Sequence, residues 1–285
     1  MVTRHRLSDV LGVALEGIDL SRPLSDAQFR EVEQAFWDGQ VLAIKGQKNL
    51  APEQYLAFAH RFGKPEPHVI DQFHYPGHPD ILILSNVKKD GKPTGLADAG
   101  SYFHTDYSYL QVPARVTMLY SIEVPKQGGN TLFANMYAAY DDLPEATKRR
   151  IDDLVVLHHY GNRDDLDERS RTAASPLSAD QKEKVTWVRH NLVRVHYGTK
   201  RKALYAVSGS SFEIEGMPRD EAVALLDELK SHALQDKYRY SYAYEVGDVV
   251  LWDDLSTLHS ATLTDPNDPR TLWRITVKEP IGTWA

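Results

Sequence analysis

Short runs rich in β-branched and aromatic residues, separated by turn residues, dominate the sequence from residue 115 onward. They are Arg115 to Val124, Thr131 to Met136, Leu154 to Tyr160, Leu192 to Tyr197, Ala203 to Ser208, Tyr238 to Tyr244, Val249 to Trp252 and Leu272 to Val277. Many short strands at this spacing are typical of a jelly roll or barrel, whereas a doubly wound parallel sheet alternates strands with helices. The sequence therefore predicts a mainly β protein with flanking helices.

Helical patterns flank or interrupt these runs, and the first of them opens with a capping box, Ser25 to Gln28. Helices are expected over residues 25–39, 52–63, 144–153 and 220–234. Between the second helix and the β-rich region we expect a long loop over residues 64–80, a strand at Ile81 to Leu84 and a polar, mobile flap over Lys88 to Gly100. The turn Val246 to Asp248 is expected to join the strands on either side of it.

The composition narrows the class of protein. The 285 residues carry a formal net charge of −7, which argues against nucleic acid or an acidic membrane surface as a partner. The absence of cysteine excludes disulfides, thiolate metal sites and cysteine nucleophiles. Met1 to Asp9 is polar, and no run approaches about 18 apolar residues, so we expect a cytoplasmic protein without a membrane span. No repeat or linker divides the chain, which predicts one domain over residues 1–285.

The segment His104-Thr105-Asp106 stands at the start of the β-rich region and is the first candidate for a metal site. In an extended strand, residues i and i+2 point to the same face, so His104 and Asp106 can reach one ion. The aromatic residues around them are Tyr102, Phe103, Tyr107 and Tyr109. The alternative is an ordinary surface pair at a strand edge. The other such triplet, His78-Pro79-Asp80, is a weaker candidate because the proline disturbs strand geometry.

Three residues near the C-terminus extend this candidate site. His259 follows a strand of buried type, so it is either a core residue or a third metal ligand. Two histidines and one carboxylate leave three coordination positions open, which is the arrangement of non-haem Fe(II) oxygenases. Arg270 and Arg274 are four residues apart in an apolar run, so in a strand their guanidinium groups face one side. Such arginines indicate an anionic ligand or, alternatively, a structural ion pair.

Several motifs in order resemble the taurine dioxygenase/phenoxyacetate-herbicide dioxygenase (TauD/TfdA) family of Fe(II)- and 2-oxoglutarate-dependent oxygenases. The resemblance extends from about Phe62 to Lys278, and its motifs are His104-Thr105-Asp106, Gly128-Gly129-Asn130-Thr131, Gly247-Asp248 with Trp252-Asp253 and His259, and Arg270 with Arg274. It implies a distorted double-stranded β-helix, a jelly roll of the cupin type. It also implies that O2 and 2-oxoglutarate are used to hydroxylate a C–H bond of a small substrate, with release of succinate and CO2.

By position, the resemblance implies that His104, Asp106 and His259 bind Fe(II), which makes them the catalytic metal ligands. Thr131 and Arg270 would hold the distal carboxylate of 2-oxoglutarate. This distal end is the C5 carboxylate, whereas the C1 carboxylate and the keto oxygen would chelate the metal.

The resemblance also implies residues that contact the substrate. Arg274 would lie near both 2-oxoglutarate and the anionic group of the prime substrate, while His68 and Tyr107 would contribute to the substrate pocket. We therefore expect a small carboxylate, sulfonate or sulfate ester as substrate, and a homo-oligomer, either a dimer or a tetramer. His68 as an ordinary exposed loop residue is the alternative at that position.

The chain departs from the family pattern at three places. Phe103 replaces a frequent tryptophan, Asp254 stands where an asparagine is common, and Gly100 takes the place of an asparagine found in taurine oxidisers. Taurine is therefore not implied as the substrate. Two other classes stay open: a cupin-type metalloenzyme that does not use 2-oxoglutarate, and a non-catalytic jelly-roll binding protein. A halogenase is disfavoured because Asp106 fills the position that chloride would need.

Overall fold

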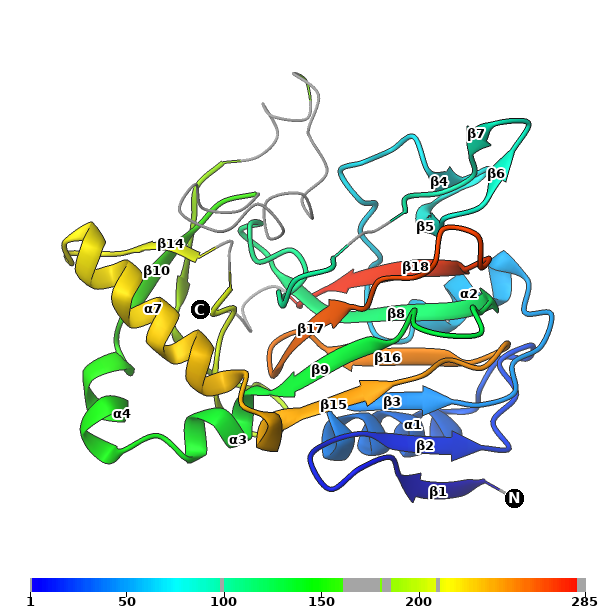
Figure 1. The fold of residues 1–285 in the computed structure, drawn as a ribbon. Helices are drawn as coiled ribbons and strands as arrows, with labels where there is room; N and C mark the ends of the chain where they lie inside the picture. Colours follow the sequence, from blue (N-terminus) through cyan, green and yellow to red (C-terminus); the bar gives the residue numbers. More distant parts are fainter. Residues whose placement is uncertain (1, 98–99, 161–179, 181–185, 209–210, 281–285) are drawn as a thin grey trace.

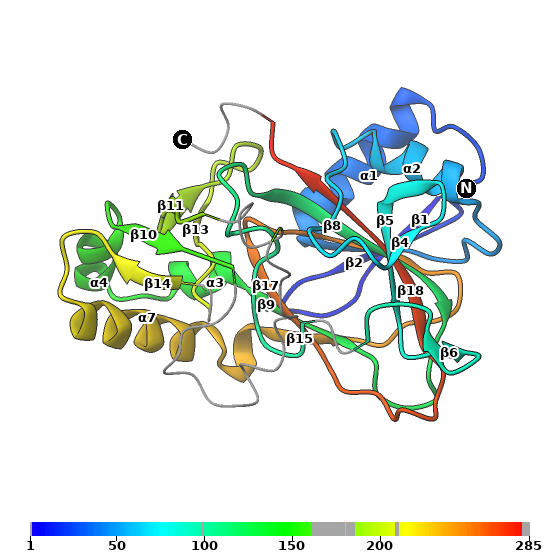
Figure 2. The same cartoon turned by 90° about the horizontal axis from the view of Figure 1, so that it is seen from above.

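Two β-sheets that pack face to face form the centre of the molecule (Figures 1 and 2). The computed structural model describes residues 2–97, 100–160, 180, 186–208 and 211–280. The larger sheet contains, in order, β1 (Thr3–Arg6), β2 (Val13–Glu16), β3 (Val41–Ile44), β16 (Val249–Asp253), β8 (Ala114–Glu123), β18 (Thr271–Lys278), β5 (His78–Ser85) and β4 (His74–Tyr75). The smaller sheet contains β15 (Arg239–Tyr242), β9 (Thr131–Asn135) and β17 (Thr257–Ala261). Only the pairing of β2 with β3 is parallel among the described strands.

The alternation of side chains along each strand decides which ones face the second sheet. In β8, Met118 packs on the helical side of the larger sheet, whereas Leu119 belongs to the core between the two sheets. In β18, Ile275 likewise packs on the helical side, and the neighbouring Arg274 lines a cavity on the other. The inner faces of these two central strands therefore supply the floor of that cavity.

Two helices cover the outer side of the larger sheet. They are α1 (Asp26–Gly39) and α2 (Pro52–Ala59), and their apolar stripes pack on it through residues such as Phe36. The predicted capping box opens α1: the hydroxyl of Ser25 accepts a hydrogen bond from the backbone N–H of Gln28 at 3.3 Å. This layer leaves the opposite face of the sheet free to pack against the smaller sheet.

A second packed region lies beside the two sheets and forms a separate apolar cluster (Figure 2). Its elements are α3 (Met136–Asp141), α4 (Glu145–Ile151), β10 (Val155–His158), β11 (Val188–Asn191), β12 (Val193–Val195), β13 (Lys202–Leu204), β14 (Ser211–Ile214), α7 (Arg219–Ala233) and the 3-10 turn η1 (Asp236–Tyr238). The core-facing stripe of α7 includes Leu225, Leu226 and Leu229. None of the helices in the described ranges is long and apolar enough to cross a bilayer.

The predicted mainly β architecture with flanking helices is confirmed, and so is the helix over residues 26–39. The second helix ends at Ala59, earlier than predicted. The loop expected over residues 64–80 is wrong in part, because β4 lies within it and β5 begins at His78. Hydrogen bonding to β18 and β4 extends this strand beyond the apolar stretch that marked it in the sequence.

Two further expectations need correction. The turn Val246 to Asp248 does not close a hairpin, because β15 pairs with β9 whereas β16 pairs with β3 and β8, so this segment crosses between the sheets. Part of the expected flap is a small hairpin of β6 (Lys88–Lys89) and β7 (Lys92–Pro93), while residues 98 and 99 of the flap lie outside the described residues. Mobility of the flap stays a prediction.

Candidate active site

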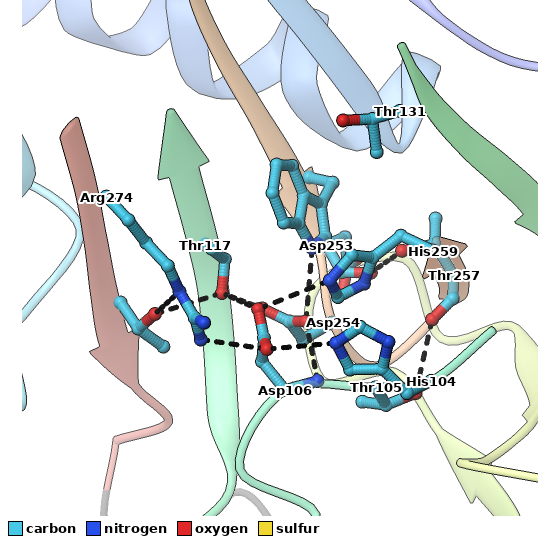
Figure 3. Close-up of polar contacts among 12 residues, drawn as sticks. His104, Thr105, Asp106, Thr117, Thr131, Asp253, Asp254, Thr257, His259 and Arg274 are labelled. Carbon is cyan, nitrogen blue, oxygen red and sulfur yellow. Dashed lines mark hydrogen bonds and ion pairs between the residues drawn. The ribbon is translucent and has the colours of Figure 1, made fainter. Parts of the chain in front are cut away.

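The three metal-ligand candidates meet at the edge of the smaller sheet (Figure 3). His259 lies on β17, and His104 pairs with it through two backbone hydrogen bonds of 2.9 Å. Nε2 of His104 lies 3.6 Å from Oδ1 of Asp106, and Nε2 of His259 lies 3.5 Å from Oδ2. Two ligands at right angles, each about 2.1 Å from one ion, are roughly 3 Å apart. The spacing therefore suits a single ion between them.

The protonation of His104 supports the same conclusion. Its Nδ1 lies 2.7 Å from the carbonyl oxygen of Tyr102, and because a carbonyl only accepts, Nδ1 must carry the proton. With its proton on Nδ1, His104 can present the lone pair of Nε2 to a metal ion. Burial, followed by the neighbouring His104, holds the pKa of His259 well below its usual value, so that imidazole is neutral. Two imidazoles and a carboxylate fit a divalent transition metal.

The side chains of His104 and Asp106 converge as predicted, but the extended strand predicted for this segment is wrong. His104 makes an isolated bridge, and Asp106 already begins a turn. The next residue, Tyr107, has a positive φ of 53°. The carboxylate reaches the histidines because the chain turns sharply there, and not because residues i and i+2 share a strand face.

Asp106 is also held from the side of the larger sheet (Figure 3). Nη2 of Arg274 lies 2.8 Å from Oδ1, and the hydroxyl of Thr117 lies 2.7 Å from Oδ2. Burial opposes ionisation of Asp106, but the charge of Arg274, with help from the hydrogen-bonding contact of His104, outweighs it and holds the pKa of Asp106 well below its ordinary value. The carboxylate is thus an anion whose orientation is set before any metal binds.

A second buried carboxyl, that of Asp254, lies behind Asp106. The hydroxyl of Thr117 is 2.8 Å from Oδ2 of Asp254 as well as 2.7 Å from Asp106. The hydroxyl of Thr117 has one proton and can donate it to only one of these two carboxyl groups. The proton in the other hydrogen bond must therefore come from a carboxyl group. Burial and the charge of Asp106 raise the pKa of Asp254 well above its usual value. Asp254 therefore donates to Thr117, which donates to Asp106, and a neutral acid takes the place of the asparagine common in the related pattern.

The metal group opens into a cavity of about 500 Å³, including the solvent at its mouth. Thr131, Arg270 and Arg274 line this cavity together with the metal group, so the structure brings together the residues expected to contact 2-oxoglutarate. Arg270 is positioned by Gly129, whose carbonyl accepts a hydrogen bond from Nε at 3.2 Å. A Cβ at Gly129 would lie 3.0 Å from Cδ and Nε of Arg270, which explains the glycine in this turn.

The structure places Tyr107 near the guanidinium group of Arg274, and His68 next to Tyr107. The guanidinium carbon of Arg274 lies 5.7 Å from the ring centre of Tyr107, and the rings of Tyr107 and His68 are 6.0 Å apart. Burial and the charge of Arg274 lower the pKa of His68 to about 3, so its imidazole is neutral. Its Nδ1 accepts a hydrogen bond from the N–H of Ile70 at 3.1 Å. These contacts argue against His68 as an exposed loop residue, but neither His68 nor Tyr107 is among the residues that line the cavity of the metal group, so their place in the substrate pocket stays a prediction.

Several residues of the site carried no signal that sequence analysis could use. Leu119 lines the cavity and Thr117 reaches Asp106 because β8 turns this face inward. Trp252 and Asp254 were visible in the sequence, as part of a motif and as a departure from it, but their roles were not. The ring of Trp252 packs 4.6 Å from that of His259, and its indole N–H donates to Asp254 at 3.2 Å.

Gly100 abuts the metal group directly. Its φ is +74°, and a Cβ there would lie 2.6 Å from Cε1 of His104. A side chain at this position would have to displace the metal-binding imidazole. The asparagine that taurine oxidisers carry at the corresponding place therefore does not fit this backbone.

Comparisons with known proteins agree with this geometry. The model of the family described as taurine catabolism dioxygenase TauD, TfdA family matches residues 4–276. An alpha-ketoglutarate-dependent 2,4-dichlorophenoxyacetate dioxygenase of Burkholderia sp. (strain RASC) is 35% identical over 92% of this chain and 89% of that protein. Pentalenolactone F synthase of Streptomyces arenae is 31% identical over 96% of this chain and 95% of that protein.

A solved structure gives the same result. The crystal structure of AAD-2 in complex with Mn(II) and N-oxalylglycine has a TM-score of 0.82 and 32% sequence identity, and the match covers 99% of this chain and 98% of that one. The match extends over the jelly roll and over the region beside it. The chain therefore belongs to the TauD/TfdA family and is a 2-oxoglutarate-dependent dioxygenase.

Proposed function

We propose that the metal is Fe(II), held by His104, Asp106 and His259. The observation that carries this proposal is the convergence of two imidazoles and one anionic carboxylate at an open cavity. Such a set leaves three positions open for 2-oxoglutarate and O2. Bound Fe(II) would supply the redox chemistry that couples decarboxylation of 2-oxoglutarate to hydroxylation of a C–H bond, with succinate and CO2 as products.

The cavity residues have distinct tasks in this proposal. Arg270 binds the distal carboxylate of 2-oxoglutarate through a charge-assisted hydrogen bond, and Thr131 adds a hydroxyl donor. Arg274 holds Asp106 in place and presents positive charge toward the substrate side. Support comes from the shared cavity and from the ion pair of 2.8 Å between Arg274 and Asp106.

The substrate is a small organic anion with an apolar or aromatic body. Its anionic group would lie near Arg274, and its body would contact His68 and Tyr107, whose rings are 6.0 Å apart. Support comes from two relatives: one is named for 2,4-dichlorophenoxyacetate, an anion, and another, from Acinetobacter baylyi, is named an alkylsulfatase. We also propose that the protein is a homo-oligomer and that it is located in the cytoplasm.

A titration of the metal site tests the proposal for 2-oxoglutarate and Fe(II). Anaerobic addition of 2-oxoglutarate to protein loaded with Fe(II) should produce the weak visible charge-transfer band of a chelated keto acid. Arg270→Ala should weaken 2-oxoglutarate binding by about 10-fold to 100-fold, because the lost hydrogen bond involves two charged groups. An unchanged affinity in this variant would contradict the role given to Arg270.

The substrate class needs a separate experiment. Sulfonates, sulfate esters, aryloxy acids and amino acids are screened for substrate-stimulated release of succinate. His68→Ala should then lose substrate-coupled turnover while the slow uncoupled consumption of 2-oxoglutarate continues. Unchanged kinetics with the true substrate would remove His68 from the pocket.

A further inference from the structure

Tyr244 contacts a residue that lines the cavity, and no motif in the sequence marks it. Its hydroxyl oxygen lies 2.8 Å from Oγ1 of Thr131, a residue that lines the cavity together with Arg270. The positive charge of Arg270 also acts on this phenol and favours its ionised form. Burial raises the pKa of Tyr244 to about 12, against the opposing effects of the hydrogen bond to Thr131 and of Arg270.

The position of Tyr244 is fixed by the segment that crosses between the two sheets. Tyr242 is the last residue of β15 and pairs with Thr131 in β9, so Tyr244 lies just beyond the end of that ladder. The following residue, Glu245, donates its backbone N–H to Oδ2 of Asp248 at 2.8 Å. The crossing segment is therefore clamped on both sides of Tyr244.

Asp248, which holds this segment, is a buried carboxylate with a charged partner. Oδ2 of Asp248 also accepts hydrogen bonds from the phenol of Tyr242 at 2.7 Å and from Nζ of Lys45 at 2.8 Å. The ring of Tyr244 packs edge-on against that of Tyr242, with centroids 5.1 Å apart. A phenol held in this way loses little freedom when it forms a hydrogen bond, which is what an organised ligand site requires.

A hydroxyl pair of this kind can direct a proton. The threonine hydroxyl has one proton and two acceptor positions, and the phenol is the more acidic donor of the two. When Tyr244 donates to Thr131, the proton of Thr131 is left to point at another acceptor. In the cavity that acceptor would be an anion beside Arg270.

We propose that Tyr244 is a positioning residue for the distal carboxylate of 2-oxoglutarate: it donates to Thr131, so that Thr131 donates to the carboxylate alongside Arg270. This inference rests on the proposed placement of 2-oxoglutarate. The distal end of the site then has two layers, with Thr131 and Arg270 touching the ligand and Tyr244 acting through Thr131. Tyr244 does not touch the keto-acid end, which lies at the metal.

Because Tyr244 acts only at the distal carboxylate, its substitution should weaken the binding of 2-oxo acids that carry this group and spare those that lack it. Tyr244→Phe should weaken binding of 2-oxoglutarate about fivefold, the effect of one neutral hydrogen bond. Binding of 2-oxobutyrate, a 2-oxo acid without a distal carboxylate, should change less than about twofold. Both are measured with protein loaded with Fe(II), without O2, by the visible band of the chelated keto acid.

Two companion variants make the test specific. Tyr240→Phe removes a phenol from β15, just before Tyr244 in the chain. The ring of Tyr240 packs against the same core, but the residue pairs with Phe133 and not with Thr131, so 2-oxoglutarate affinity should stay unchanged. Thr131→Val removes the hydroxyl through which Tyr244 acts. In that background, Tyr244→Phe should cause no further loss.

The outcomes separate the possible failures. An unchanged 2-oxoglutarate affinity in Tyr244→Phe, a loss that is equal for 2-oxobutyrate, or a full further loss in the Thr131→Val background would each overturn the role of Tyr244. A wild-type protein that shows no band with 2-oxoglutarate would instead overturn the proposed placement of the cosubstrate, and with it this inference.

Discussion

Two regions of the molecule bury a pair of histidines beside an arginine–carboxylate ion pair. The first is the metal group with its arginine: His104, His259, Asp106 and Arg274. The second, here called the inner cluster, lies where β10 to β13 meet the end of β18: His158, His190, Arg194, Tyr205 and Glu279. The ion pair measures 2.8 Å in both regions. By residue type and burial, the two regions are nearly the same.

They differ in where the polar atoms point. The ligand atoms of the metal group lie within 4.8 Å of one another and face a cavity. In the inner cluster, the rings of His158 and His190 are 5.4 Å apart, and Nε2 of His190 is bound to the carbonyl of Leu110 at 3.0 Å. Arg194 stacks over the ring of Tyr205 at 4.6 Å. Convergence of free lone pairs on one point, and not burial of polar groups, distinguishes a site from a packed core.

The largest expected difference concerns the metal. His259→Ala should reduce Fe(II) affinity and succinate production by more than about 100-fold, because one of three ligands is lost and changes to supporting residues alone cost 10-fold to 100-fold. His190→Asn in the inner cluster should leave both unchanged. Metal titration and succinate assays of the two variants check this. A comparable loss in His190→Asn would erase the distinction between the regions.

The second prediction concerns stability: a change in the inner cluster should destabilise the protein without affecting the metal site. Glu279→Leu should destabilise the protein by about 3–5 kcal/mol, because it leaves Arg194 buried without its carboxylate. The double variant with Arg194→Met should recover most of this loss. Chemical denaturation gives the free energies of unfolding, and the Fe(II) affinity of the folded variant should match that of the wild type. A stable single variant would show that the ion pair does not hold the inner cluster together.

Asp254 tests how far the metal group depends on its supporting residues. Asp254→Leu removes the donor to Thr117 and should weaken Fe(II) binding by about 10-fold to 100-fold. Asp254→Asn keeps a neutral donor of the same shape and should stay within about threefold of the wild type. Fe(II) titration of both variants measures this. Equal losses in the two variants would mean that Asp254 acts as a charged carboxylate.

The smallest effect is a pH dependence of the inner cluster. Burial and the charge of Arg194 lower the pKa of His190 to about 4, so the folded state binds the proton less well than the unfolded chain, whose pKa is about 6.5. Stability is therefore full above pH 6.5 and falls as the pH drops toward 4. Between pH 7.5 and 5, His190→Asn should lose about 1–2 kcal/mol less than the wild type in denaturant titrations. An identical pH profile would exclude His190 as a cause.

Much of this protein follows from local patterns. The capping box at Ser25 and the alternating apolar residues of β8 and β18 act over a few residues, so the sequence predicts these elements directly. The site residues were also predictable from their types and order, since an imidazole, a carboxylate and two arginines in an apolar run restrict the chemistry severely. The elements that were missed, such as β1 (Thr3–Arg6), depend on partners far away along the chain.

Only the tertiary structure decided how the site residues meet and which other residues support them. Composition did not separate His259 from His158, because both are buried histidines in strand regions. The sharp turn after Asp106, the neutral acid at Asp254 and the contact of Tyr244 with Thr131 likewise depend on positions of atoms contributed by distant segments. Hydrogen bonds and ligand geometry act over about 3 Å, and that distance is set by packing between the sheets.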